Sequence, residues 1–253
     1  MKRITLTILI ALFSITAFSQ RFVGAGIAGF NLTQIDGDQI YGYHKVGFNG
    51  GASVMVALDA KQHWFLTMEL LYNQKGSYRK SLVDSMQYMG DDEINYNVKY
   101  NEKLKYKVNL DYVEVPLLAH FEDPKTGVAF GVGFSWARLV RAKELESGWT
   151  LYTDLQSKTY KTNDWSAIAD VKIRVWKGLK FNFRFQYSMT PIRIRTYTSK
   201  RTGDSWERKQ YHNTLSLRVI YAFNERYTLN TKKNKYGERI GTKWVRDLDN
   251  PNY

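Results

Sequence analysis

Apolar and polar residues alternate along the chain from Leu179 to Met189. The odd-numbered positions are Leu, Phe, Phe, Phe, Tyr and Met, and the even-numbered positions are Lys, Asn, Arg, Gln and Ser. Successive residues of a β-strand point to opposite faces, so this segment predicts a strand with one apolar and one polar face. A soluble sandwich can carry such a strand, but an unbroken row of large apolar side chains is more typical of contact with lipid.

Seven further segments show the same alternation, which brings the predicted strands to eight. These segments are residues 22–30, 44–58, 64–76, 106–121, 128–136, 165–176 and 214–223. Pro116 lies within one of them, and a proline cannot donate to a sheet ladder, so a bulge or a weakened ladder is expected there.

The connections between these segments alternate between short and long. Residues 59–63, 122–126 and 177–178 are short, and residues 31–43, 78–105, 142–163 and 190–211 are long. Short periplasmic turns, long external loops and an even number of strands are typical of outer-membrane barrels. A soluble barrel such as a lipocalin would keep its apolar face inside instead. We therefore predict an all-β fold, an eight-stranded antiparallel up-and-down transmembrane β-barrel of the outer membrane.

Aromatic residues at the ends of the predicted strands fit this interpretation. They are Trp64, Phe121, Trp176 and Phe223 at the short-turn end, and Tyr72, Trp136, Trp165 and Tyr187 at the other end. Two such rows are typical of the aromatic girdles at the two membrane interfaces.

The first 19 residues resemble a secretory signal peptide. Lys2 and Arg3 precede a mostly apolar run, and Ala17 and Ser19 are small residues placed before Gln20. The run is shorter than the roughly 20 residues that a transmembrane helix needs. We expect a signal peptide over 1–19, the barrel over 20–223, and a basic periplasmic tail over 224–253 that is flexible or docks a partner.

The amino-acid composition excludes some kinds of site and indicates the charge of possible partners. Cysteine is absent, which excludes disulfides, thiol catalysis and thiolate metal sites. The formal net charge is +13, and loss of Lys2 and Arg3 with the signal peptide lowers it to 13 − 2 = +11. An exported protein rarely meets nucleic acid, so lipopolysaccharide phosphates are the nearer anionic partner. Charge scattered over solvated loops is equally consistent.

Several short segments resemble a known family. They are residues 29–38, GFNLTQIDGD; 42–45, GYHK; 47–51, GFNGG; 69–72, ELLY; 74–77, QKGS; and 110–118, LDYVEVPLL. Together they resemble the PorT-type "porin family" of Bacteroidota outer-membrane barrels over most of the mature chain. The resemblance implies an outer-membrane location and, for some members, a part in type IX secretion and gliding. It implies no catalytic residues.

Charged residues fall on the inward face of the predicted strands. This lumen charge network comprises Glu69, Glu114, Asp170, Lys172, Arg174, Lys180, Arg184 and Arg218. An eight-stranded barrel is about wide enough for side chains to fill, and an unpaired buried charge costs several kcal/mol. We therefore expect structural salt bridges that plug the barrel, with a gated ion path through the same residues as the alternative.

Other candidate sites are weaker. The external loop 190–211 carries Arg193, Arg195, Lys200 and Arg201 among aromatic residues, which suits phosphates, glycans or proteins but also simple solvation. Asp164, Ser166 and His212 could meet at the external rim as hydrolytic residues, although nothing in their spacing favours it. The four histidines lack zinc-ligand spacing, and Asp36-Gly37-Asp38 is better explained as a turn than as a calcium loop. We predict no catalytic residues, no cofactor and no metal.

These observations predict a non-enzymatic outer-membrane protein, structural or accessory to secretion or envelope assembly. It would interact through its loops and tail with outer-membrane lipid, lipopolysaccharide and periplasmic or outer-membrane proteins, and not with nucleic acid. The alternative is a small porin-like diffusion channel for ions or small solutes, and an enzyme at the rim is a third possibility.

Overall fold

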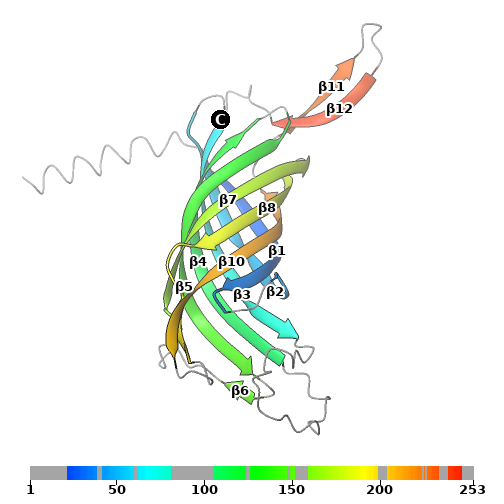
Figure 1. Cartoon of the computed structure of the whole chain (residues 1–253). Coiled ribbons are helices and arrows are strands. Elements are labelled where there is room, and N and C mark those ends of the chain that lie inside the picture. The colour runs from blue at the N-terminus through cyan, green and yellow to red at the C-terminus, as the bar shows by residue number, and fades with distance from the viewer. Residues whose placement is uncertain are drawn as a thin grey trace, which may run out of the picture.

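The computed structural model contains one closed β-barrel and a separate two-stranded hairpin (Figure 1). It describes residues 22–38, 42–59, 62–80, 105–123, 126–146, 149–151, 159–198, 204–223, 225, 227–233 and 239–246. The predicted signal peptide and the predicted loop residues Lys200 and Arg201 lie outside the described residues.

Eight long strands form the barrel. They are β1 (Phe22–Asp36), β2 (Lys45–Ala57), β3 (Trp64–Lys80), β4 (Lys105–Glu122), β5 (Val128–Glu146), β7 (Asn163–Trp176), β8 (Leu179–Ser188) and β10 (Ser205–Ala222). Each pairs antiparallel with the next, and β1 pairs with β10 from Ala25↔Ala222 to Asp36↔Tyr211. The sheet is therefore closed, and the predicted eight-stranded antiparallel barrel is confirmed.

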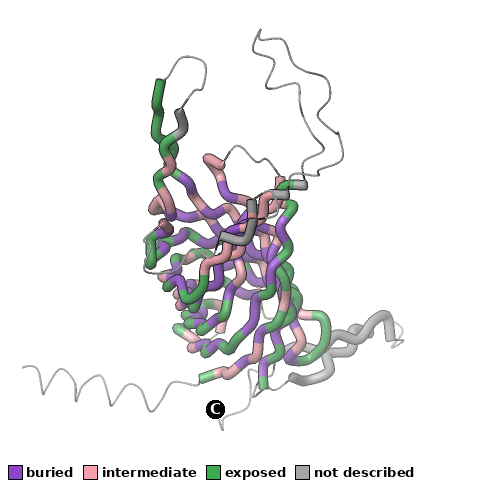
Figure 2. The backbone as a smooth tube through the Cα atoms, turned by 90° about the horizontal axis from the view of Figure 1, so that it is seen from below, coloured by how far each residue is buried: buried purple, intermediate pink, exposed green. Residues whose placement is uncertain are grey.

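The barrel keeps its polar side chains inside and its apolar side chains outside, with buried and exposed residues alternating along the strands (Figure 2). In β8, for example, Lys180 and Arg184 are buried, whereas the intervening Phe181 and Phe183 are 52% and 48% exposed. Exposure of such a row of phenylalanines to water is unfavourable, whereas its contact with acyl chains is favourable. On β3 the outward row from Trp64 to Tyr72 extends about 26 Å along the strand. With a strand tilt of about 40° this is a height of about 20 Å, comparable to the roughly 25 Å of an apolar membrane band.

Aromatic contacts mark both edges of this band. The rings of Trp64 and Phe121 lie 5.2 Å apart at the short-turn end. The rings of Tyr187 and Tyr211 stack 6.2 Å apart at the opposite end. No helix in the described part of the chain is long and apolar enough to cross a bilayer.

Several strands continue past this band at the external end, where we expected loops. Two short strands add to this end: β6 (Trp149–Leu151) pairs with β5, and β9 (Arg193–Thr198) pairs with β10. The residue types on the two faces change here, because the apolar Leu110 and Leu139 are buried while Arg138 and Arg141 are exposed. The external end therefore has the apolar-inside pattern of a water-soluble barrel. The pairing of β4 with β5 also shifts register in this region, between Asp111 and Tyr112.

Pro116 keeps its register opposite Ser135 on β5. On its other side the pairing of β4 with β3 is interrupted between Met68↔Leu117 and Leu71↔Glu114, without a change of register. This is the weakened ladder expected where a proline cannot donate, and no bulge accompanies it.

The tail contains regular structure that apolar alternation did not predict. Strands β11 (Tyr227–Lys233) and β12 (Arg239–Arg246) pair as an antiparallel hairpin within residues 224–253. The two segments lack apolar alternation, but β-branched residues such as Thr228, Thr231 and Thr242 favour strands without it. Figure 1 shows the hairpin at the barrel end opposite β6.

Candidate functional site

Two carboxylates and two guanidinium groups from four different strands meet in the middle of the lumen. Arg184 on β8 donates from Nη1 and Nη2 to the two oxygens of Glu69 on β3, each at 2.9 Å. Arg184 Nη2 also donates to Asp170 Oδ2 on β7 at 2.8 Å, and Arg218 Nη1 on β10 donates to Glu69 Oε2 at 2.9 Å. All four side chains are at most 1% exposed. This central cluster, Glu69, Asp170, Arg184 and Arg218, links opposite walls of the barrel.

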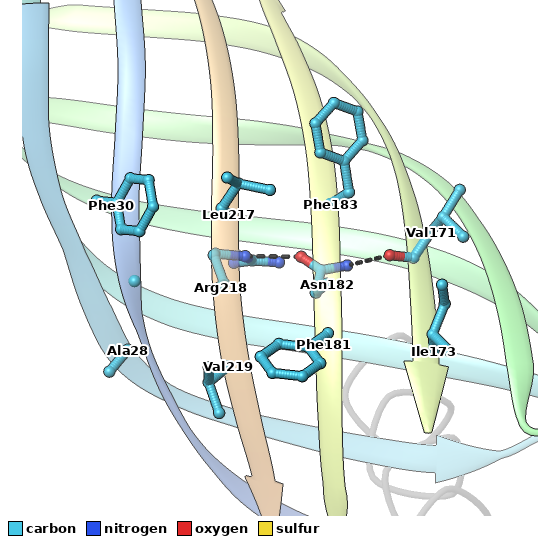
Figure 3. Close-up of a pocket in the computed structure, with 11 residues that line it drawn as sticks. Ala28, Phe30, Val171, Ile173, Phe181, Asn182, Phe183, Leu217, Arg218 and Val219 are labelled. Carbon is cyan, nitrogen blue, oxygen red and sulfur yellow. Dashed lines mark hydrogen bonds between the residues drawn. The ribbon is translucent and has the colours of Figure 1, made fainter. Parts of the chain in front are cut away.

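Neutral groups complete the central cluster. Arg218 Nε donates to Asn182 Oδ1 at 2.8 Å, and Asn182 Nδ2 donates to the Val171 carbonyl at 3.1 Å (Figure 3). His120 Nε2 lies 2.9 Å from Asp170 Oδ1, and its Nδ1 lies 2.9 Å from the Thr67 hydroxyl. A glycine makes room for this histidine, because a Cβ on Gly131 would lie 2.4 Å from the His120 ring.

Ion pairs continue above and below the central cluster. Towards the external end, Lys75 Nζ lies 3.2 Å from Glu114 Oε2 and 3.3 Å from Asp164 Oδ2. Gln186 Nε2 donates to the other oxygen of Glu114 at 2.6 Å. Towards the short turns, Arg174 pairs with Glu122, and Lys180 Nζ lies 2.9 Å from Glu225 Oε1. The carboxylates therefore have basic or amide partners along the lumen.

Positive and negative charges are equal in number among the residues of these ion pairs together with the buried Lys172. The buried Lys45, Asp111 and Glu144 lie further towards the external end and are not part of this set. The six cations are Lys75, Lys172, Arg174, Lys180, Arg184 and Arg218, and the six anions are Glu69, Glu114, Glu122, Asp164, Asp170 and Glu225. With the histidines neutral these charges cancel. The positive surplus of the chain therefore lies outside this set, on surfaces, loops and the tail.

Apolar clusters flank the charged layer. One fills the external end and comprises Ile35, Val108, Leu110, Tyr112, Ala137, Leu139, Tyr160 and Ile192. The other lies on β1, β2, β3 and β10 and comprises Ala25, Ile27, Met55, Phe65, Leu71, Ile220 and Ala222. An eight-stranded barrel leaves little more room than its own side chains need. The lumen is accordingly a packed interior of charged and apolar layers.

A second polar cluster lies beyond the lipid band, at the external end. Glu144 accepts hydrogen bonds from the Tyr106 hydroxyl at 2.9 Å and from the Tyr160 hydroxyl at 3.2 Å. Arg193 Nη1 donates to both Glu144 oxygens at 3.3–3.4 Å, and the Arg193 guanidinium lies 5.0 Å from the Tyr160 ring centroid. Burial and the negative charge of Glu144 raise the pKa of Tyr160, so its phenol remains a donor.

A groove of about 650 Å³ crosses the outer face of β1, β10, β8 and β7 (Figure 3). Its walls are two rows in register, Phe30–Leu217–Phe183–Val171 and Ala28–Val219–Phe181–Ile173. The strands remain paired beneath it, so the groove belongs to the lipid-contacting surface and does not open into the lumen.

The sequence was compared with known families and structures. A family model described as "Outer membrane protein beta-barrel domain" matches residues 18–193, more than half of the chain. The protein belongs to this family. No relative was found among curated proteins.

Solved structures of small outer-membrane barrels are similar in fold. Neisserial surface protein A shares 12% identity with a TM-score of 0.44, over 81% of this chain and 99% of that one. The attachment invasion locus protein Ail of Yersinia pestis shares 12% with a TM-score of 0.41, over 79% and 99%. A major outer membrane protein from Thermus thermophilus shares 13% with a TM-score of 0.42, over 81% and 100%. At these identities and TM-scores, the likenesses support no conclusion about this protein. Its family, together with its own closed barrel and apolar outer face, places it in the outer membrane.

The structure shows where the residues singled out from the sequence lie in the barrel. All eight members of the predicted lumen network have buried side chains, and seven of them take part in the ion pairs described above. The eighth, Lys172, is 4% exposed and pairs in register with Asn182. Sequence reasoning did not assign Lys75, Glu122, Asp164 and Glu225 to this network, although the inward position of Lys75 was visible in the alternation.

The possible hydrolytic group does not assemble. Ser166 Oγ donates to Asp164 Oδ2 at 3.4 Å. The His212 ring is directed to the Tyr112 hydroxyl, with Nε2 at 3.1 Å, and not to the serine. Nucleophilic catalysis needs the base within hydrogen-bond reach of the nucleophile, and these three side chains are at most 1% exposed. Within the described residues, no group of three or more metal-ligating side chains is found either.

Proposed function

We propose that this protein is a non-enzymatic, non-conducting outer-membrane barrel that acts through the structures carried at its two ends. The charge-balanced lumen carries this proposal. Its central guanidinium groups contact carboxylates at 2.8–2.9 Å across the barrel. A water-filled path would require these pairs to separate, and breaking a buried pair costs about 3–5 kcal/mol. The barrel then serves as a rigid anchor in the lipid.

The elements that differ from a minimal barrel lie at the ends. The external end carries β6, β9 and the polar cluster around Glu144. The opposite end carries the hairpin of β11 and β12, in which Lys232, Lys233 and Lys243 contribute to the basic character of the tail. We propose that these ends contact lipopolysaccharide and periplasmic or outer-membrane proteins, in a structural role or one accessory to envelope assembly.

A more specific form of the proposal is a role in type IX secretion. It rests on the resemblance of segments such as residues 69–77 and 110–118 to PorT-type barrels. Crosslinking from the tail, followed by identification of the captured partners, tests this form. Loss of residues 224–253 without any change in the complexes would contradict a docking role for the tail.

Planar-bilayer recording tests the central proposal against a small diffusion channel. We expect the purified, reconstituted protein to show no steady openings. A double variant, Glu69→Ala with Arg184→Ala, removes one cation and one anion together and serves as a control with a widened lumen. Steady openings of the unmodified protein, with an ion selectivity that Glu69→Gln alters, would overturn the proposal.

A further inference from the structure

A β-bulge at the external rim turns Arg141 to the outer face of β5. Leu139 lies opposite Tyr112 of β4, whereas Arg141 lies opposite Asp111. Val140 is therefore an extra residue without a partner on β4. Such an insertion exchanges the two faces of the strand beyond it and redirects side chains. Leu139 is buried, so Arg141, two residues later, would also face inward without the bulge, but it is exposed.

Arg138 lies on the same outer face. It is exposed, and it is in register with Val113 on β4 and with Asn163 on β7. Val113 and Asp111 are two residues apart on β4, so the two arginines opposite them are separated by about 7 Å along the sheet. The bulge therefore brings two guanidinium groups close enough to contact the same anion.

A row of apolar and aromatic side chains lies directly below these arginines, on the membrane side. Val115, Trp136 and Trp165 are in register on β4, β5 and β7. Trp165 is 46% exposed, and both tryptophans belong to the aromatic girdle of the external end. Arg138 lies two residues above Trp136, a height of about 5 Å for a strand tilted by about 40°. The arginines are thus at the level where lipid headgroups meet acyl chains.

The charge of this surface is positive. Among the described residues of these rows the single carboxylate is Asp111, which is 5% exposed and balances part of the charge of Arg141. The Arg138 guanidinium forms no hydrogen bond or ion pair with another described residue. A guanidinium group presents a planar fork of donors that matches two oxygens of a phosphate. The surface therefore suits a phosphate group held mainly by Arg138.

The position of the arginines indicates the source of that phosphate. An arginine at a membrane interface lays the stem of its side chain along apolar surface and keeps its charged end in the polar layer. A soluble anion would make no use of the tryptophans below. A lipid would place its phosphate against the arginines and its acyl chains against Val113 and Trp165. Charge and apolar contacts thus match a single amphiphile.

We propose that Arg138 and Arg141 bind a phosphate of lipopolysaccharide, at its lipid A headgroup, with Trp136 and Trp165 against the sugar and acyl chains of the same molecule. This inference rests on the proposed function, because it assigns a site to the lipopolysaccharide contact of the external end. Lipid A binding that survives the loss of both arginines would overturn the site and leave the proposed function standing. Conductance tests that function separately.

Binding is measured by native mass spectrometry on the full-length protein released from detergent micelles. The probes are lipid A with both phosphates and the same lipid after removal of both phosphates. We expect the phosphorylated lipid to bind about tenfold more tightly or better, because only it matches the guanidinium forks. Inorganic phosphate in excess should not displace it. Displacement by inorganic phosphate would show a site for free anions and overturn the assignment to a lipid.

A double variant and a matched control separate this site from general charge. Arg138→Gln with Arg141→Gln should weaken lipid A binding by about tenfold or more. The control, Arg79→Gln with Arg208→Gln, removes two exposed arginines from β3 and β10 at the same end of the barrel. We expect the control to stay within about twofold of the unmodified protein, because separated surface charges are screened by salt.

Two single variants keep the test valid if the double variant fails to fold. Arg138→Gln leaves Arg141 opposite Asp111 and should still weaken binding several-fold. Arg138→Lys keeps the charge but removes the fork, and should weaken binding by a smaller factor. Heat-dependent gel mobility reports the folding of each variant. Equal losses in the site and control double variants, or equal binding of the two lipids, would overturn the proposal.

Discussion

Removal of the Glu69 carboxylate should destabilise the barrel more than removal of a carboxylate that is exposed to water. Glu69 accepts three hydrogen bonds from two guanidinium groups at 2.9 Å. Asp170 remains as a partner for Arg184 at 2.8 Å, but its oxygen lies 3.6 Å from Arg218 Nη2. In Glu69→Ala, Arg218 is therefore left without a close carboxylate. Loss of one member of a buried pair costs about 3–5 kcal/mol, and we expect the lower part of that range because Asp170 compensates in part.

Urea unfolding of the protein folded into lipid vesicles measures this cost. With a denaturant slope of about 3 kcal/mol per molar, the midpoint should fall by about 1 M. Glu207→Ala, which removes an exposed carboxylate from the external end of β10, should leave the midpoint within about 0.2 M because exposed charges contribute little. Adding Arg218→Ala to Glu69→Ala should cost less than the sum of the single changes, since the unpaired charge is then absent. Equal midpoints for Glu69→Ala and Glu207→Ala would refute the central role assigned to this carboxylate.

Three further predictions concern other layers of the molecule. Phe183→Lys places a charge in the lipid band and should cost about 2–4 kcal/mol, whereas Ile194→Lys on β9, beyond the lipid band, should cost less than about 0.5 kcal/mol. Similar folded fractions of the two variants on gels would contradict the assignment of the outer face to lipid. The raised pKa of the buried Tyr106 and Tyr160 phenols gives stability that is complete below about pH 10 and lost as the pH rises further. Protease resistance of the external end should therefore begin to fall above about pH 10, and the fall should be smaller in Tyr106→Phe with Tyr160→Phe. Gly131→Leu should displace His120 from Asp170 at a cost of about 1–3 kcal/mol, while Val132→Leu on the outer face should assemble normally.

The eight strands of the barrel could be predicted from alternation because every outward position within the membrane contacts lipid and is therefore apolar. For β8, the predicted residues 179–189 agree with the observed Leu179–Ser188. The external ends could not be predicted in this way. Strand β5 continues to Glu146, ten residues beyond the predicted end. Beyond the lipid band the apolar residues face inward and the polar residues face water. In addition, the register shift next to Asp111 interrupts the period of two.

The inward position of the central charges also follows from alternation, but their partners do not. Glu69 and Arg218 come from β3 and β10, 149 residues apart in sequence. Which charges meet across a barrel depends on the stagger between its strands, and a single sequence contains no direct signal of that stagger. Glu122 and Glu225 were missed for a similar reason, because they lie at or beyond the ends of strands, where the alternation stops.

The pairing of charges across the lumen constrains how this protein can assemble. Glu69 lies on the third strand of the chain, while Arg218 lies on the last barrel strand, β10. In a growing sheet that lacks β10, the Glu69 carboxylate would have only some of its hydrogen-bond donors, because Arg218 would be absent. The seam between β1 and β10 is thus both the final hydrogen-bonded ladder and the step at which water can leave the interior. Insertion into lipid should accordingly be an all-or-none event that is completed only when β10 pairs with β1.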